Sequence, residues 1–499
     1  MMPKVFRGCQ KSLCFVAAAA LGFLLLHFSL PEFAYISTYA KTIWQSQGMY
    51  LGLSLASSVP EDPCTGRYIY MHDLPTRLNQ DLLTKCQTLR KKFNFCPYVE
   101  NEGFGSRLNL NDSSENSESV MSGKSWYETN QFSSAMMFHT RMKQYECLTT
   151  NSSLASAIYA PYYPGLEAGR YMFGRFNLSA KDAGALDFTS WLRGRPEWLR
   201  LYGWDHFFVA GRITWDFRRP SYLGTNWGSK LMNLPETKNM TMLTIESSPY
   251  ANNDFAIPYP TFFHPSNDNE VLQWQERVKR TKRTHLFAFA GAPRPHITSS
   301  VRGELISQCK KASGKRCNLV NCAPKNKISC NSPDHILKAF MMSDFCLQPT
   351  GDSYTRRSTF DAILMGCIPV FVHPGSAYTQ YFWHLPKNYT SYSVYIPRQG
   401  IKNGTVSVEK VLLRIPQNAV TAMREVVIGM IPSIIYARNK LKTTEDAFDI
   451  AIKGILERIE DARRNIIEGK DPRSRFPEKS TWKYYLTGKV DKHEWDSFF

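Results

Sequence analysis

The stretch that decides the fold class is FCLQPTGDSYTRRSTFDAILMGCIPVFV, residues 345–372. Its first five residues form a short strand, and residues 350–355 are a loop of Thr, Gly, Asp, Ser and Tyr that favours turns. Residues 356–366 follow with a helical pattern, and residues 367–372 form the next apolar strand. Strands that alternate with helices in this way predict a parallel sheet in an α/β domain.

The same alternation continues on both sides of this stretch. Upstream, residues 285–290 form a strand that is broken by Gly-Ala-Pro-Arg-Pro, and a helical pattern begins near Ser300. In the first half of the chain, residues 67–71, 157–160 and 207–210 are further strand candidates. The pattern therefore predicts α/β structure in both halves.

The length of 499 residues is too great for one ordinary domain. A Pro-rich passage at 257–265 indicates an interdomain linker. We therefore expect a first domain at 61–265, a second at 266–430 and a C-terminal helical tail at 431–499. Hydrophobic residues make up 43% of the chain and charged residues 21%, which is the composition of a folded protein rather than a disordered one.

An uncharged stretch near the N-terminus, LCFVAAAALGFLLLHFSL at 13–30, predicts a transmembrane signal anchor. As a helix it spans roughly 27 Å, which nearly matches a hydrocarbon core of roughly 30 Å. Three basic residues precede it, so residues 1–12 would form a cytosolic tail and the stem at 31–60 would be lumenal. The alternative is a cleaved signal peptide, whose apolar region is shorter and ends at a small-x-small site; here Pro31-Glu32-Phe33 follows.

A lumenal location predicts N-glycosylation, and all the N-x-S/T sequons lie beyond the anchor. Their asparagines are Asn111, Asn151, Asn177, Asn239, Asn388 and Asn403.

Cysteine usage agrees with an oxidising lumen, because ten of the twelve cysteines lie beyond the anchor. We expect Cys346 and Cys367, which lie in apolar strands, to be core residues. Four others crowd into one basic segment and predict a disulfide-stapled loop; a zinc site is the alternative, but no paired C-x-x-C is present. These four are Cys309, Cys317, Cys322 and Cys330.

The formal net charge of +18 indicates an anionic partner. Membrane headgroups, acidic glycans and nucleotide diphosphates all qualify, whereas the sequence has no arginine-rich tract or zinc spacing typical of nucleic-acid binding. It also contains no D-x-D triplet, which metal-dependent sugar transferases commonly use. P-loop and G-x-G-x-x-G fingerprints are absent too, which disfavours an ATPase or a dehydrogenase.

The loop at 350–355 is the candidate anion site, because ligands of α/β sheets bind beyond the carboxyl ends of the strands. Arg356 and Arg357 start the next helix, where free backbone N–H groups already favour an anion. Their guanidinium groups suit a diphosphate. Asp361 lies one helical turn after Arg357 and could accept hydrogen bonds from a ribose; the alternative is an ion pair between Asp361 and Arg357 along the helix.

At this point a family resemblance is clear. Residues 345–386 closely resemble the donor-site region of exostosin-type glycosyltransferases, in the plant branch that contains xyloglucan galactosyltransferases. RYIYMHDLP from Arg67, GWDHFFVAGRITWDFRR from Gly203 and LFAFAGAPRP from Leu286 agree with it in order. The resemblance covers roughly residues 64–460.

The resemblance implies a GT-B fold, with two Rossmann-like domains facing a cleft, the acceptor on the N-terminal side and the donor on the C-terminal side. It also implies a single-pass type II protein of the Golgi membrane with a lumenal catalytic domain. The donor would be UDP-galactose and the acceptor the xylose side chains of xyloglucan. The linkage would be β, so the transfer inverts the donor. No divalent metal is expected, and a homo-oligomer or a complex with other Golgi glycosyltransferases is possible.

An inverting transfer needs a general base, in-line presentation of the donor and stabilisation of the departing diphosphate. We expect Asp361 to hold the ribose, and other donor-site residues to bind the diphosphate or line the nucleotide pocket. These are Gly291, Arg294, Arg302, Gln348, Ser353, Tyr354, Arg356 and Arg357.

The candidate base is the pair Asp205 and His206, which precedes a strand of the acceptor domain. The pair could instead be a structural cap or a buried hydrogen-bonded pair, and His72-Asp73 is a second candidate. Two other functions remain open: transfer of galacturonate or arabinose to a related wall polysaccharide, and a catalytically silent subunit of a glycan synthase complex.

Overall fold

The computed structural model describes residues 62–89, 93–108, 120–121, 123–172, 174–219, 226–312, 316–323, 330, 333–472, 495 and 498. The predicted cytosolic tail, signal anchor and stem lie outside these residues. Within the described ranges, no helix is both long and apolar enough to cross a membrane. Of the described residues, those within 64–460, with 495 and 498, belong to one compact unit, which holds both sheets. Residues 62–63 and 461–472 belong to a second unit, and most of them form the end of a helix.

The first sheet has six parallel strands in the order β2-β1-β3-β4-β5-β6. Strand β1 pairs with β2 on one side and with β3 on the other, so the strand order reverses between β1 and β3. Strands β3, β4 and β5 consist of buried residues throughout, as expected for a sheet covered on both faces. The strands are β1 (Ile69–Met71), β2 (Leu148–Thr149), β3 (Ala157–Tyr159), β4 (His206–Val209), β5 (Thr241–Thr244) and β6 (Asp254–Ala256).

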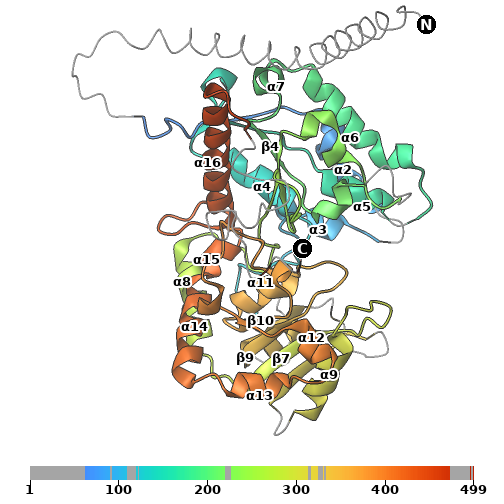
Figure 1. Cartoon of the computed structure of the whole chain (residues 1–499). Helices are drawn as coiled ribbons and strands as arrows, with labels where there is room; N and C mark the ends of the chain where they lie inside the picture. The colour runs from blue at the N-terminus through green and yellow to red at the C-terminus, as the bar shows by residue number, and fades with distance from the viewer. Residues whose placement is uncertain are drawn as a thin grey trace, which may run out of the picture. The chain divides into compact units, whose positions relative to one another are not determined.

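Helices connect these strands and cover the sheet in the upper half of Figure 1. The longest is α6 (Leu178–Arg193), which begins where the Asn177 side chain accepts a hydrogen bond from the backbone N–H of Ala180. The others are α2 (Gln80–Thr84), α3 (Cys96–Val99), α4 (Ser134–Lys143), α5 (Pro164–Tyr171) and α7 (Pro196–Leu201).

The second sheet has five parallel strands in the order β11-β10-β9-β7-β8. Its strand order reverses between β7 and β9, which are direct neighbours. In a doubly wound sheet, ligands bind at the carboxyl ends of the two strands on either side of such a reversal. The strands are β7 (His285–Gly291), β8 (Cys317–Asn321), β9 (Ser343–Gln348), β10 (Ile368–Phe371) and β11 (Val394–Tyr395).

The helices of this second part lie around its sheet in the lower half of Figure 1. Helix α8 is amphipathic, and only Val271, Trp274 and Val278, three or four residues apart, are buried. The helices are α8 (Asp268–Arg280), α9 (Arg302–Lys311), α10 (Pro333–Met341), α11 (Arg357–Leu364), α12 (Arg398–Lys402), α13 (Val408–Leu413), α14 (Gln417–Gly429) and α15 (Ile431–Ile434).

The chain returns to the first sheet after α15. Helix α16 (Ala447–Ile467) buries Phe448, Ile452 and Ile455 in the hydrophobic core that also contains Ile69 of β1. Helix α15, by contrast, lies in the core of the second sheet. Within the predicted tail at 431–499, the described helices α15 and α16 therefore pack into two different cores. The linker expected at 257–265 lies between the end of β6 and the start of α8.

The ten cysteines beyond the predicted stem form disulfides. The expected stapled loop is present as two bridges, Cys309–Cys317 and Cys322–Cys330. Cys346 and Cys367 lie in the core, as expected, and the structure adds that they form a disulfide with each other. Pro369 pairs with Cys346 in the ladder between β9 and β10, so Cys367 stands diagonally across from Cys346 with a Cα–Cα distance of 5.8 Å.

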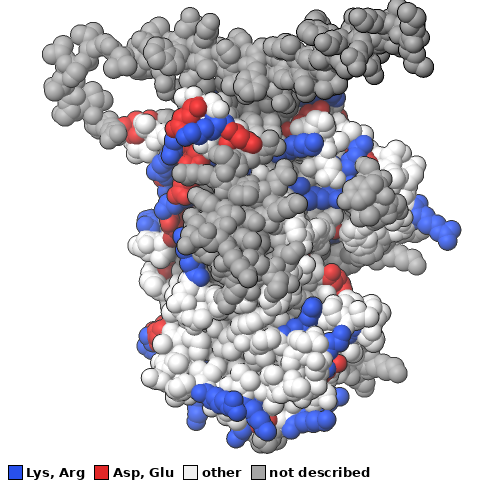
Figure 2. All heavy atoms as spheres, in the orientation of Figure 1, with Lys and Arg blue, Asp and Glu red and all other residues white. Residues whose placement is uncertain are grey.

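On the face shown in Figure 2, Lys and Arg side chains form separate patches among uncharged residues and alternate with acids along one edge. The excess positive charge of the sequence is therefore dispersed on this face rather than gathered into one stripe.

Candidate active site

The candidate donor site lies at the carboxyl ends of β7 and β9. These two strands pair in register, with Ala288 opposite Cys346, so the loops that follow them leave the sheet side by side. The first loop contains Arg294 and leads to α9, and the second runs from Pro349 to Arg356 and leads to α11.

Three guanidinium groups meet at these loops. Arg302 donates from Nε to the backbone oxygen of Thr350 at 3.2 Å, which joins the start of α9 to the loop after β9. Arg294 forms an ion pair with Asp352 at 3.5 Å. Burial, and then the charges of Arg356 and Arg294, lower the pKa of Arg302 to about 10. Three positive groups this close predict a site for a highly charged anion.

Arg356 lies against its own loop. Its side chain folds back over Gly351, and the contact is so close that a Cβ atom built on that glycine would stand 0.8 Å from Nη2 of Arg356. Its Nε and Nη2 atoms are buried and have no hydrogen-bond partner within the described part of the chain. Burial lowers the pKa of Arg356. Buried donors are nearly always satisfied in native proteins, so these two are suited to receive phosphate oxygens.

The remaining predicted donor-site residues surround this cluster. Gln348, the last residue of β9, accepts a hydrogen bond from Ser358 Oγ at 2.6 Å. Ser353 closes the loop by accepting a hydrogen bond from the Gly351 backbone N–H at 2.9 Å. Gly291 ends β7 at the carboxyl edge of the sheet.

Tyr354 forms a flat aromatic surface at the same edge. Its ring stacks on His373, with centroids 4.8 Å apart and planes 14° apart. Gly375 lies against both rings: a Cβ there would stand 3.1 Å from each of them. Such a surface is suited to the planar base of a nucleotide.

Arg357 does not join the three guanidinium groups. It lies 3.5 Å from the ring centroid of Phe262 and donates from Nη1 to the backbone oxygen of Thr129 at 2.7 Å. It also pairs with Asp361 at 3.7 Å, and burial raises the pKa of Asp361 to about 6 although Arg357 opposes the shift. The sequence alternative of an ion pair therefore describes these two side chains, with the difference that Asp361 is buried and Arg357 is only 15% exposed.

Asp205 and His206 lie at the amino end of β4 and are fully buried. They form a chain in which Arg200 donates to Asp205, Asp205 bonds to His206 Nδ1 at 2.7 Å, and His206 Nε2 lies 3.2 Å from His72 Nε2. Burial alone would raise the pKa of Asp205, but His206 and Arg200 more than offset this and lower it to about 2.

This buried chain matches the structural alternative stated for the Asp205–His206 pair. Trp191 of α6 packs edge-on against His72, which closes the chain from that side. The neighbouring candidate is divided, because His72 is buried whereas Asp73 is exposed. None of the described contacts brings Asp205 or His206 to the donor loops.

One residue of this region was not anticipated from the sequence. Glu246 follows β5 in the first sheet, and its carboxylate bonds to Thr355 in the donor loop. No local pattern could have shown this, because the contact joins residues 109 positions apart.

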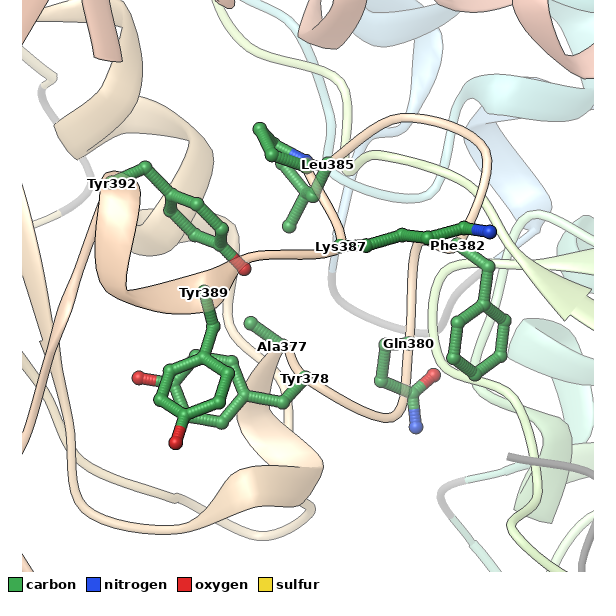
Figure 3. A pocket seen from close by; sticks show the side chains of 9 residues that line it. Ala377, Tyr378, Gln380, Phe382, Leu385, Lys387, Tyr389 and Tyr392 are labelled. Carbon is green, nitrogen blue, oxygen red and sulfur yellow. The ribbon is translucent and has the colours of Figure 1, made fainter. Parts of the chain in front are cut away.

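A pocket in the second part of the chain is shown in Figure 3. It lies beside the segment from Ala377 to Tyr392 and has a volume of about 20 Å³. This is room for about one water molecule, and it is too small for a nucleotide sugar. Its lining residues are Ala377, Tyr378, Gln380, Phe382, Leu385, Pro386, Lys387, Tyr389 and Tyr392.

The sequon asparagines differ in their surroundings. Asn239 is partly buried and donates its side-chain nitrogen, which would carry a glycan, to the backbone oxygen of Tyr202 at 3.1 Å. Asn111 lies outside the described residues. The exposed ones are Asn151, Asn177, Asn388 and Asn403.

No group of three or more His, Cys, Asp or Glu residues within the described ranges is arranged to hold a metal ion.

Comparisons with known proteins agree with the resemblance seen in the sequence. The chain is 50% identical over 445 residues to the Xyloglucan galactosyltransferase MUR3 of Arabidopsis thaliana, covering 88% of this chain and 70% of that protein. It is 50% identical to the Probable xyloglucan galactosyltransferase GT12 of the same plant, covering 83% and 81%.

A more distant relative, the Xyloglucan-specific galacturonosyltransferase 1 of Arabidopsis thaliana, is 37% identical and covers 79% of this chain and 58% of that protein. The model of the Exostosin GT47 domain matches residues 63–412, which is more than half of the chain. The chain therefore belongs to the exostosin GT47 family of glycosyltransferases.

Proposed function

We propose that this chain is an inverting glycosyltransferase that moves galactose from UDP-galactose to the xylose side chains of xyloglucan. The names of the two relatives at 50% identity support the donor and the acceptor. The observation that carries the donor class is the cluster of Arg294, Arg302 and Arg356 at the strand reversal of the second sheet. A nucleoside diphosphate bound at the carboxyl ends of these strands would have its negative charge next to these guanidinium groups.

We infer a GT-B arrangement, with the first sheet on the acceptor side and the second on the donor side. Both sheets are wholly parallel, and both reverse their strand order next to the first strand. The carboxyl edges of the two sheets are in contact, since Glu246 after β5 bonds to Thr355 before α11. Substrates held at these edges would be close enough to react.

In this proposal the three guanidinium groups stabilise the charge that develops on the departing diphosphate. Tyr354 stacks on the uracil ring, and Gln348 and Ser353 line the nucleotide pocket. The buried Oδ1 atom of Asp361, which has no partner within the described part of the chain, accepts a hydrogen bond from the ribose. We propose that no divalent metal takes part, because the three guanidinium groups can supply the positive charge that a metal supplies in other sugar transferases.

For the general base we propose Asp216 in place of Asp205 and His206. Asp216 lies on the loop after β4, next to Glu246, at the carboxyl edge of the acceptor sheet. Burial raises its pKa, although Arg212 and Trp227 oppose the shift. Trp227 donates its indole N–H to Asp216 at 2.9 Å and is 44% exposed, so an acceptor sugar could stack beside the carboxylate.

We further propose that residues 1–60 anchor the enzyme in the Golgi membrane, with its catalytic part in the lumen. Disulfides throughout the described part support an oxidising compartment. Association with itself or with other Golgi glycosyltransferases remains part of this proposal. A donor other than UDP-galactose is the second candidate, favoured by the relative named as a galacturonosyltransferase.

The test uses residues 61–499 secreted from a eukaryotic host. The fragment is incubated with xyloglucan oligosaccharides, a panel of UDP-sugars and EDTA, and the products are identified by mass. A hexose added from UDP-galactose alone is the expected result. Transfer of galacturonate or a pentose would replace the donor, and UDP binding without transfer to any acceptor would favour a silent subunit. Asp216→Asn should lower kcat by about 10² while UDP affinity stays unchanged.

A further inference from the structure

We propose that Glu246 is a positioning residue of the donor site: from the acceptor sheet, it fixes the loop that places the Arg356 guanidinium for the donor diphosphate. The inference rests on the proposed function, because it assumes that Arg356 meets a diphosphate. It adds that the acceptor half of the chain builds part of the donor site.

The Glu246 side chain is completely buried, and both of its carboxylate oxygens are engaged. Oε2 accepts two hydrogen bonds from Thr355, one from the backbone N–H at 2.7 Å and one from Oγ1 at 2.6 Å. Oε1 accepts a hydrogen bond from Trp215 Nε1 at 2.9 Å. Three donors aimed at one carboxylate hold it in a single orientation.

Glu246 is itself held rigidly in the first sheet. Its backbone oxygen accepts a hydrogen bond from the Thr214 N–H at 2.9 Å, as part of a bridge between Ile213 and Glu246. On either side of it, the Ile245 oxygen accepts from Tyr381 Oη at 2.8 Å, and Ser247 bonds to a glutamine of the second part.

Thr355 is the position at which this support acts on Arg356. It directly precedes Arg356, whose backbone is extended, at φ −148° and ψ 140°, before α11 begins. The hydroxyl of Thr355 also bonds to Tyr259 Oη at 3.0 Å, so the residue is held from two directions. The Arg356 side chain then folds back over Gly351, and its Nε and Nη2 atoms have no partner in the described residues.

These contacts explain how a guanidinium can remain in place without partners of its own. An arginine side chain has several rotatable bonds, and holding it in one position costs rotamer entropy. A fixed backbone before it and a fixed loop beneath it lower that cost before the donor arrives. Glu246 supplies the first of these supports.

The alternative is that Glu246 only stabilises the fold. Another buried acid of the same sheet is a matched control for this alternative. Asp254 in β6 is also buried, accepts a hydrogen bond from the Ser248 N–H at 2.8 Å and pairs with Arg218 at 3.1 Å. Its hydrogen bonds and ion pair join it to residues of the first half of the chain. Asp254→Asn should therefore alter stability without altering the donor loop.

The experiment measures the Kd of UDP and of uridine for the secreted fragment by calorimetry, and the KM of the UDP-sugar alongside kcat. Glu246→Gln replaces one of the two acceptor oxygens with an NH2 group, so the side chain can no longer accept hydrogen bonds from both Thr355 and the Trp215 indole. We expect it to weaken UDP binding by about 10-fold, to change uridine binding less than about twofold and to raise KM more than it lowers kcat. Thr355→Val, which keeps Glu246, should weaken UDP binding in the same direction.

A double-mutant cycle separates positioning from general damage. If Glu246 acts through Arg356, then Glu246→Gln combined with Arg356→Ala should bind UDP no more weakly than Arg356→Ala alone. Additive losses, equal losses for uridine and UDP, or an unchanged UDP affinity in both Glu246→Gln and Thr355→Val would each overturn the inference while leaving the proposed function in place. A wild-type fragment that bound no UDP would overturn both.

Discussion

Replacing Gly351 by alanine tests whether the Arg356 guanidinium binds the donor. A Cβ at this position would stand 0.8 Å from Nη2 and 1.6 Å from Cζ of Arg356. Gly351 is not among the glycines with positive φ, so alanine fits its backbone. The substitution therefore displaces one guanidinium and keeps its charge on the chain.

The size of the effect follows from this geometry. Non-bonded atoms settle about 3.5 Å apart, so the guanidinium must move by roughly 2.5 Å, which takes it out of hydrogen-bond reach of its former position. Loss of one or two charge-assisted hydrogen bonds, each worth about 1.5 kcal/mol or more, weakens UDP binding by about 10- to 100-fold. Folding should not suffer, because the same change stabilises loops by about 0.4–1 kcal/mol where the backbone permits it.

The assay is calorimetric titration of UDP into the secreted fragment, together with thermal unfolding of each variant. Gly303→Ala is the matched control: it lies in α9 beside Arg302, and a Cβ there would meet nothing within 4 Å. We expect the control to bind UDP like the wild type and to unfold at a slightly higher temperature, because alanine favours helices by about 1 kcal/mol over glycine. A folded Gly351→Ala variant with wild-type UDP affinity would refute a role for Arg356 at the diphosphate.

Three further predictions concern stability and modification. Burial lowers the pKa of five histidines to about 3 or 4; these are His72, His139, His264, His373 and His384. Below pH 6.5 the folded state therefore binds fewer protons than the unfolded state, and its stability falls as the pH drops from 6.5 towards 4. At pH 5.5 each of these histidines lowers the free energy of unfolding by about 1.4 kcal/mol, and buried acids with raised pKa values partly offset this loss. Urea unfolding at pH 7.5 and 5.5 measures the net loss, and equal stabilities would contradict it. Replacing Cys346 and Cys367 together by alanine should lower the free energy of unfolding by about 3 kcal/mol, judged from the 21-residue separation, and an unchanged denaturation midpoint would count against this. Peptide mapping should find glycans at exposed Asn151 and Asn177 but none at Asn239, whose amide is bonded to the backbone.

The local elements of the donor half could be predicted closely from the sequence. The strand expected from Phe345 is β9, the helix expected at 356–366 is α11 (Arg357–Leu364), and the strand expected at 367–372 is β10. Short-range patterns in the sequence predict these elements: an apolar run, a turn-rich loop and a helical periodicity. The family resemblance was likewise confirmed, because it rests on contiguous motifs.

Features that depend on distant parts of the chain could not be predicted in the same way. The Cys346–Cys367 disulfide depends on the register between β9 and β10, and two cysteines in apolar strands look alike whether paired or free. The return of α16 to the first core depends on which apolar faces were still uncovered. Glu246 sits in the sequence TIES, which contains no recognisable motif, and its role becomes visible only when Thr355 is placed beside it.

Arg356 and Arg357 show why neighbouring residues of the same type cannot be assigned one role from sequence. Arg356 is the last extended residue before α11, and Arg357 is the first residue inside the helix, so their side chains leave the backbone in different directions. Arg356 turns back over its own loop, whereas Arg357 reaches Phe262 and the backbone of Thr129 in the first half of the chain. The Arg356 guanidinium is therefore available to a ligand, whereas the Arg357 guanidinium joins the two halves of the chain. Together with Glu246, Arg357 ties the start of α11 to the first half of the chain. Under the proposed function, residues from both halves would therefore set the position of the donor diphosphate.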